Sequence, residues 1–178
     1  IRLNHVDVAR GIAILCIIIG HLGNYNIARV VFTFHVPIFF LITGYFTSTN
    51  GSNRDFIKKK FKGLIVPYII TCIAIILLGT LKSLIFYDPK NAIHTFLSWL
   101  YASVYGAGDP HTQPFYIKPI GAIWFLWATF WGCLFLKLSQ KMRSRYRTVF
   151  ILLIFLIGYY TKNIIWLPFS IQAGCCAA

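Results

Sequence analysis

The chain has 178 residues, of which 58% are hydrophobic, 17% aromatic and 12% charged, and its mean hydropathy is +0.70. Ordinary soluble domains carry about 25% charged residues, so this composition cannot cover the surface of a soluble globule. A disordered chain would be less hydrophobic and more charged. The composition therefore predicts an integral membrane protein, with the lipid bilayer as its solvent.

The net charge of +13 comes mainly from two short basic segments, residues 54–62 and 137–147. Each lies between long apolar runs, which is typical of the cytoplasmic loops of a membrane protein. A nucleic-acid-binding domain would instead spread its cations over one face, among polar side chains that read the bases. We therefore expect no nucleic-acid partner.

Apolar runs of helical length follow one another along the chain. A bilayer core about 30 Å thick is crossed by about 20 apolar residues in a helix. The runs cover residues 11–28 (in a helix that starts near Asp7), 30–53, 63–81, 119–136 and 148–161, and the tail from 167 starts another. They predict an all-α fold: a polytopic transmembrane helical bundle of about five spans plus the start of a sixth, in a single domain over residues 1–178.

The basic segments also predict the orientation, because Lys and Arg accumulate on the cytoplasmic side. Both segments, and with them the N-terminus, are expected in the cytoplasm, with the bundle in the inner membrane. The loops 22–29, 82–118 and 162–166 then lie outside. The apolar segment 91–108 would separate the two basic segments if it crossed. We therefore expect it to be interfacial or re-entrant.

The cysteines and the chain ends complete this outline. Five cysteines show no C-x-x-C or Cys/His spacing, which predicts neither a disulfide framework nor a metal site. The first residue is Ile1, and the last residues are apolar. We therefore expect the N-terminal part of a longer domain.

Two ionisable residues in the first span are candidates for function, since such groups are costly inside a membrane. Arg10 and His21 are eleven residues apart. In one helix this spacing corresponds to about 16 Å along the axis and about 20° of rotation. A cation would then lie near the cytoplasmic end, with an imidazole deeper on the same face. Asp7 precedes Arg10 by three residues, the spacing of a helical ion pair.

Purely structural roles account for these ionisable residues equally well. Arg10 can extend to the inner interface with Asp7 as its partner, and His21 can bond a backbone carbonyl. His35 precedes Pro37 by two residues. It either faces a polar cavity or satisfies the backbone that the proline leaves unpaired, and the residues favour the second interpretation.

Two motifs then point to a family. The segment HVDVARGIAILCIIIGH resembles the first motif of the acyltransferase-3 family of polytopic membrane acyltransferases, in which Arg or Lys is followed by ten residues and His. Arg10 and His21 fit that spacing. FHVPIFFLITGYF resembles the second-helix signature, closest to the fucose 4-O-acetylase-like branch.

Two further segments continue the resemblance in the family's order. FIKKKFKGLIVPYI resembles the basic segment that leads into the third helix, and AIWFLWATF resembles the W-F-L segment. Each motif alone is weak, whereas four in order are specific.

The resemblance implies transfer of an acetyl or other acyl group from acetyl-CoA to a hydroxyl of a cell-envelope glycan or lipid-linked sugar, with no permanently bound cofactor. His21 would be the general base, since imidazole accepts a proton near neutral pH. Arg10 would bind a CoA phosphate or stabilise developing negative charge. Asp7 would orient Arg10, and His35 would contact the acceptor or relay a proton.

The basic segment has two interpretations. Lys58, Lys59 and Lys60 either attract the phosphates of CoA or act only as topology determinants.

Composition alone fits a second class equally well: a transporter or lipid-linked sugar translocase without acyl chemistry. A non-catalytic membrane partner is a third possibility. The ordered motifs favour the acyltransferase.

Overall fold

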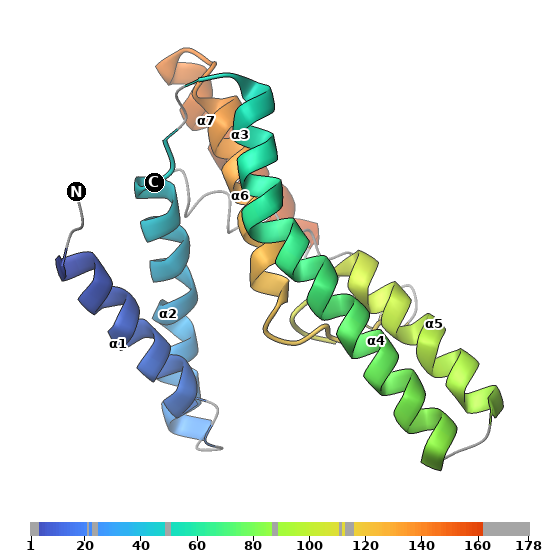
Figure 1. The fold of residues 1–178 in the computed structure, drawn as a ribbon. Coiled ribbons are helices and arrows are strands. Elements are labelled where there is room, and N and C mark those ends of the chain that lie inside the picture. The colour runs from blue at the N-terminus through green and yellow to red at the C-terminus, as the bar shows by residue number, and fades with distance from the viewer. Residues whose placement is uncertain are drawn as a thin grey trace.

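The computed structural model describes residues 4–20, 22, 25–48, 51–86, 89–110, 112 and 116–161, and the described part is helical, without a strand. The elements in chain order are α1 (Asn4–Gly20), α2 (Tyr25–Tyr45), α3 (Asn53–Lys60), the π-helical turn η1 (Phe61–Ile65), α4 (Val66–Phe86), α5 (Pro89–Tyr105), α6 (Trp124–Ser139) and α7 (Ser144–Thr161) (Figure 1). The all-α prediction is confirmed.

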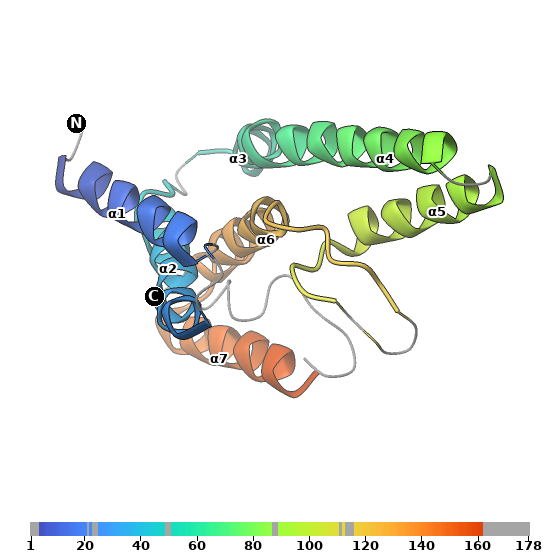
Figure 2. The ribbon, with the colours of Figure 1, turned by 90° about the horizontal axis from the view of Figure 1, so that it is seen from below.

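Helix α6 holds the arrangement together. It contacts α2, α3, η1 and α7, while α1 packs on α2 and α5 packs on α4. Figure 2 shows α6 with the α3–α4 helix on one side and α7 on the other. Phe40 of α2 and Ala128 of α6 are fully buried where these helices meet, and the Phe40 ring lies 4.8 Å from that of Phe125. The core therefore forms around α6.

The basic segment 54–62 is helical, so the prediction of a loop there was wrong. Ser52 caps the start of α3, because its side chain accepts a hydrogen bond from the Arg54 backbone N–H. Lys and Arg are good helix formers, so a run of them need not interrupt a helix. Helix α3, η1 and α4 form one helix, Asn53–Phe86, of 34 residues.

Within the described residues, Asn53–Phe86 is the helix long and apolar enough to cross a membrane by length and composition. Only 17% of its most apolar window is buried, whereas the core helix of a soluble protein would be mostly buried. Ile70, Leu78 and Ile85 are each more than 60% exposed. Helix α6 is apolar but has 16 residues. Five spans are therefore not established by the described helices.

The predicted outer loop 82–118 contains further helix, which corrects that boundary. Helix α4 continues to Phe86, and α5 returns alongside it to Tyr105 (Figure 1). The hydroxyl of Tyr68 donates to the Ser103 carbonyl oxygen, so α5 ends near the middle of the long helix. Segment 91–108 thus includes a helix that turns back partway, and its depth in a membrane stays a prediction.

The first two runs also differ from their predicted limits. Helix α1 already starts at Asn4 and ends at Gly20, and α2 covers Tyr25–Tyr45 rather than residues 30–53. Pro37 lies inside α2, and the helix continues past it.

Candidate functional site

The predicted catalytic residues are described only in part. Asp7 and Arg10 both lie in α1, with Asp7 half-buried. The backbone of His35 lies in α2, two residues before Pro37. The side chains of Arg10 and His35, and all of His21, fall outside the described residues. The described part of α1 ends at Gly20. The common face of Arg10 and His21 therefore stays a prediction.

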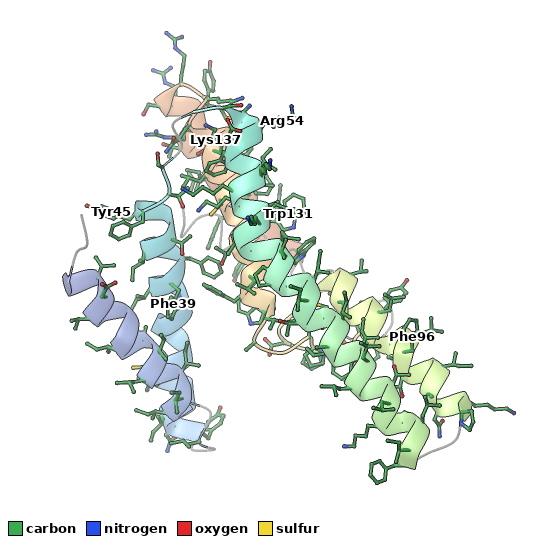
Figure 3. All side chains as sticks on the ribbon, in the orientation of Figure 1. Phe39, Tyr45, Arg54, Phe96, Trp131 and Lys137 are labelled. Carbon is green, nitrogen blue, oxygen red and sulfur yellow. The ribbon has the colours of Figure 1, made fainter. Side chains whose placement is uncertain are left out.

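The two basic segments lie at the same end of the molecule, as the orientation prediction requires. The Lys137 ammonium, near the end of α6, donates a 3.2 Å hydrogen bond to the Gly51 carbonyl oxygen, just before α3. Figure 3 shows Arg54 and Lys137 at this end. The two segments carry further exposed cations: Lys58, Lys59, Lys62, Lys141, Arg143, Arg145 and Arg147. This basic end is the most strongly charged region of the described chain.

Of the three lysines proposed to bind CoA, Lys60 is the one turned inward. Its ammonium donates a 2.8 Å hydrogen bond to Thr47 Oγ1, just beyond the end of α2. Lys58 and Lys59 are exposed, whereas Lys60 is half-buried. Successive residues of a helix are about 100° apart, so three consecutive lysines point in different directions. The structure thus separates Lys60 from its neighbours.

Thr47 connects three elements at this point. It is 8% exposed, and its hydroxyl donates to the Thr43 carbonyl oxygen at 2.6 Å while accepting from Lys60. Cys133 Sγ of α6 lies 3.8 Å from Thr47 Oγ1. A lysine beside the carbonyls at the end of α2 is also favoured by the helix dipole. One role of Lys60 is therefore to hold α2 against the long helix and α6.

A second lysine joins Lys60 at the ring of Phe56, which is 6% exposed. The ammonium of Lys60 lies 5.8 Å from the ring centroid and that of Lys137 lies 5.4 Å from it, both within range of a cation–π interaction. The two ammonium groups are therefore no more than about 11 Å apart. At an effective dielectric constant of about 20, their repulsion is about 1.5 kcal/mol at that distance. We call Lys60, Lys137 and Phe56 the lysine pair site.

A second packed cluster lies where α4, α5 and α6 meet. The rings of Tyr68 and Trp127 stack at 5.6 Å, and the Lys118 ammonium lies 5.2 Å from the Trp99 ring. Gly106 has φ +70°, and a Cβ there would lie 2.7 Å from Trp127. These contacts hold Gly106 and Lys118 against the helices, which is a structural role.

The lysine pair site was not predicted from the sequence. Lys137 was assigned only to topology, and no signal linked Thr47 or Phe56 to function. In the part of the chain that the structure describes, no three His, Cys, Asp or Glu residues are grouped so as to hold a metal ion. The groups suited to a ligand there are ammonium donors, which bind anions.

Comparison with known proteins identifies the class. Residues 3–174 match the acyltransferase-3 family, described as an acyltransferase domain. The chain belongs to this family, which confirms the resemblance inferred from the four motifs. It is also similar to the nodulation protein NolL of Mesorhizobium japonicum (strain LMG 29417 / CECT 9101 / MAFF 303099), with 30% identity over 139 residues. That match covers 70% of this chain and 32% of NolL. No solved structure matches the chain.

Proposed function

We propose that the chain is part of a membrane-bound O-acyltransferase, which moves an acetyl group from acetyl-CoA to a hydroxyl of a cell-envelope glycan or lipid-linked sugar. The observation that carries this proposal is the family match over residues 3–174. The match includes Arg10 and His21, which have the spacing of the first family motif.

The proposed setting is the inner membrane, crossed about five times with the start of a sixth span, and with the N-terminus in the cytoplasm. Two features support it. The apolar residues of α4 are mostly exposed, as expected of a helix in contact with lipid. The two basic segments meet at one end, as the positive-inside rule requires of cytoplasmic segments.

In the proposed reaction, His21 accepts the proton of the acceptor hydroxyl while the hydroxyl oxygen attacks the thioester carbonyl carbon. The C–O bond forms, and the carbonyl oxygen becomes an oxyanion. Arg10 stabilises this charge or holds a phosphate of the donor, and Asp7 orients Arg10. The intermediate then collapses, the C–S bond breaks, and the CoA thiolate takes the proton from His21.

The remaining candidates have supporting roles. His35 would contact the acceptor or relay a proton. Lys58 and Lys59 would attract the donor through long-range charge, since they are exposed on α3. Lys60 is half-buried and already bonds Thr47. A direct role in holding a phosphate therefore fits Lys60 better than its two neighbours.

The test is acyl transfer from labelled acetyl-CoA in membranes that contain the full reading frame. His21→Ala should abolish labelling of the glycan while the protein still inserts. His94→Ala is the matched control, because His94 is an exposed histidine of α5 and should leave transfer unchanged.

Full transfer by the His21→Ala variant would exclude the general-base role. If neither the unchanged protein nor the His21→Ala variant transfers label although both insert, the donor is not acetyl-CoA or the protein is a translocase. A translocase does not require CoA.

A further inference from the structure

We propose that Lys58, Lys59 and Lys62 bind the headgroups of anionic phospholipids in the leaflet on the side of the basic end. The partner is therefore a lipid surface and not a soluble ligand. This inference goes beyond the proposed function, in which Lys58 and Lys59 only attract the acyl donor at long range. It rests on the proposed membrane setting and not on acyl transfer.

The first argument is the position of these lysines along the long helix. Figure 1 shows α3 continuing into α4, and together they form one helix from Asn53 to Phe86. Residues 63–81 of this helix contain no Lys, Arg, Asp or Glu, and Lys62 and Lys82 flank them. At about 1.5 Å per residue this run is about 28 Å long, which matches a hydrocarbon core about 30 Å thick. Lys62 therefore lies at the boundary of that core.

The other two lysines lie at the level of the headgroups. Lys58 and Lys59 are about 6 to 8 Å beyond the apolar run along the same helix. A bilayer about 40–45 Å thick with a core of about 30 Å leaves about 5–8 Å on each side for the headgroups. Arg54 is about 14 Å beyond the run and therefore lies in the water past them.

The second argument is that this part of the helix presents an apolar surface to lipid. In the π-helical turn η1, the Val66 N–H donates to the Phe61 carbonyl oxygen, an i→i+5 hydrogen bond. This turn stacks Val66 on Phe61, whereas Ile65, which would follow Phe61 in an α-helix, is only 3% exposed. A continuous column of exposed apolar side chains therefore runs from α3 into α4: Ile57, Phe61, Val66, Ile70, Ile73 and Leu77.

The third argument concerns charge. Lys58, Lys59 and Lys62 are exposed, and within the described residues the structure records no hydrogen bond or ion pair for any of them. Lys58 and Lys62 each directly follow a residue of the apolar column. A lipid chain can thus lie along the column while its phosphate accepts from an ammonium group beside it. Cations clustered next to the end of a membrane-spanning helix attract anionic lipids in this way.

The test measures which lipids the full-length protein retains. The protein is reconstituted in nanodiscs of mixed phosphatidylcholine and phosphatidylglycerol without CoA, and the bound lipids are counted by native mass spectrometry. Lys58→Gln, Lys59→Gln and Lys62→Gln should each lower the preference for phosphatidylglycerol about five-fold, the usual contribution of one cation near an anionic surface. The triple variant should lower it more than ten-fold.

Matched variants separate the headgroup level from general charge. Arg54→Gln removes one exposed cation from the same helix, two turns beyond the lysines on the side away from the membrane. It should change the preference by about two-fold or less, and Lys58→Arg should retain it because the charge is kept. A loss in Arg54→Gln equal to that in the lysine variants, or no loss in the triple variant, would overturn the proposal.

A competition experiment excludes the acyl donor as the true ligand of these lysines. CoA added to the nanodiscs should not displace phosphatidylglycerol. Displacement by CoA that is lost in the triple variant would show that the lysines form a donor site, and the proposal would fail. Because binding is measured without turnover, absence of acyl transfer would contradict the proposed function and leave this inference standing. Loss of the lipid preference with transfer intact is not expected to occur in the unchanged protein, and its lack of any preference would refute only the inference.

Discussion

The hydroxyl of Tyr68 donates a hydrogen bond of 2.6 Å to the backbone carbonyl oxygen of Ser103. Tyr68 lies near the middle of the long helix Asn53–Phe86, and Ser103 lies in the last turn of α5. The last carbonyls of a helix have no partner within it. This bond therefore gives a carbonyl at the end of α5 a partner and joins that end to the long helix.

We expect Tyr68→Phe to lower the free energy of unfolding by about 1 kcal/mol, because the half-buried Ser103 carbonyl loses its partner. The ring itself, stacked on Trp127, is retained. Thermal unfolding in detergent, followed by tryptophan fluorescence, measures the change. Tyr116→Phe removes a hydroxyl from a residue that is 64% exposed and should have almost no effect. Equal stability of the two variants would show that the Tyr68 hydrogen bond contributes nothing.

Gly79→Ala should loosen the contact between α4 and α5. A Cβ at Gly79 would lie 2.7 Å from Nε1 of Trp99 and 3.0 Å from its Cδ1, so the indole must move. Such overpacking typically costs about 1–3 kcal/mol. Gly63→Ala is the control in the same long helix, since its Cβ would meet nothing within 4 Å and alanine is the better helix former. A melting temperature that rises in both variants would contradict the close approach of Trp99.

Gly106→Ala should be more destabilising than Gly121→Ala. Both glycines have positive φ, +70° and +78°, so alanine at either position is strained by about 1–2 kcal/mol. Only at Gly106 would the Cβ also meet Trp127, at 2.7 Å. The difference in melting temperature between the two variants measures how closely Gly106 packs on Trp127 of α6. No difference would mean that Gly106 is not held against Trp127.

Within the proposed function, Arg10→Lys should retain more acyl transfer than Arg10→Ala, because the family motif accepts either cation. Loss of an electrostatic stabiliser of the transition state typically lowers turnover about 100-fold or more. Arg29→Ala, at an exposed position of α2, is the control and should transfer normally. Complete and equal loss in Arg10→Lys and Arg10→Ala would indicate a bidentate contact that a guanidinium makes and an ammonium group does not.

Cysteine labelling tests the placement of the basic end. In a background without native cysteines, Lys59→Cys and Lys141→Cys should react with an impermeant maleimide from the same side, because their segments meet at Gly51 and Lys137. Lys90→Cys, at the start of α5 beyond the far end of α4, should react from the opposite side. Reaction of Lys59→Cys and Lys141→Cys from opposite sides would contradict both the fold and the proposed topology.

The sequence by itself determined the class of secondary structure and the family. Apolar runs of helical length specify helices through local hydrogen bonds, and four ordered motifs specified the acyltransferase-3 family. Local sequence patterns predicted the ends of the helices less well than their existence. Segment 54–62 was assigned to a loop by its charge, but the Ser52 cap and the helix-forming lysines make it the start of the long helix.

Only the tertiary structure distinguished Lys60 from Lys58 and Lys59. Its partners are Thr47, thirteen residues earlier, and the Phe56 ring that it shares with Lys137 of α6. These contacts depend on how the long helix is rotated against α2 and α6. That rotation results from packing between distant segments, and a pattern read along one segment does not contain it.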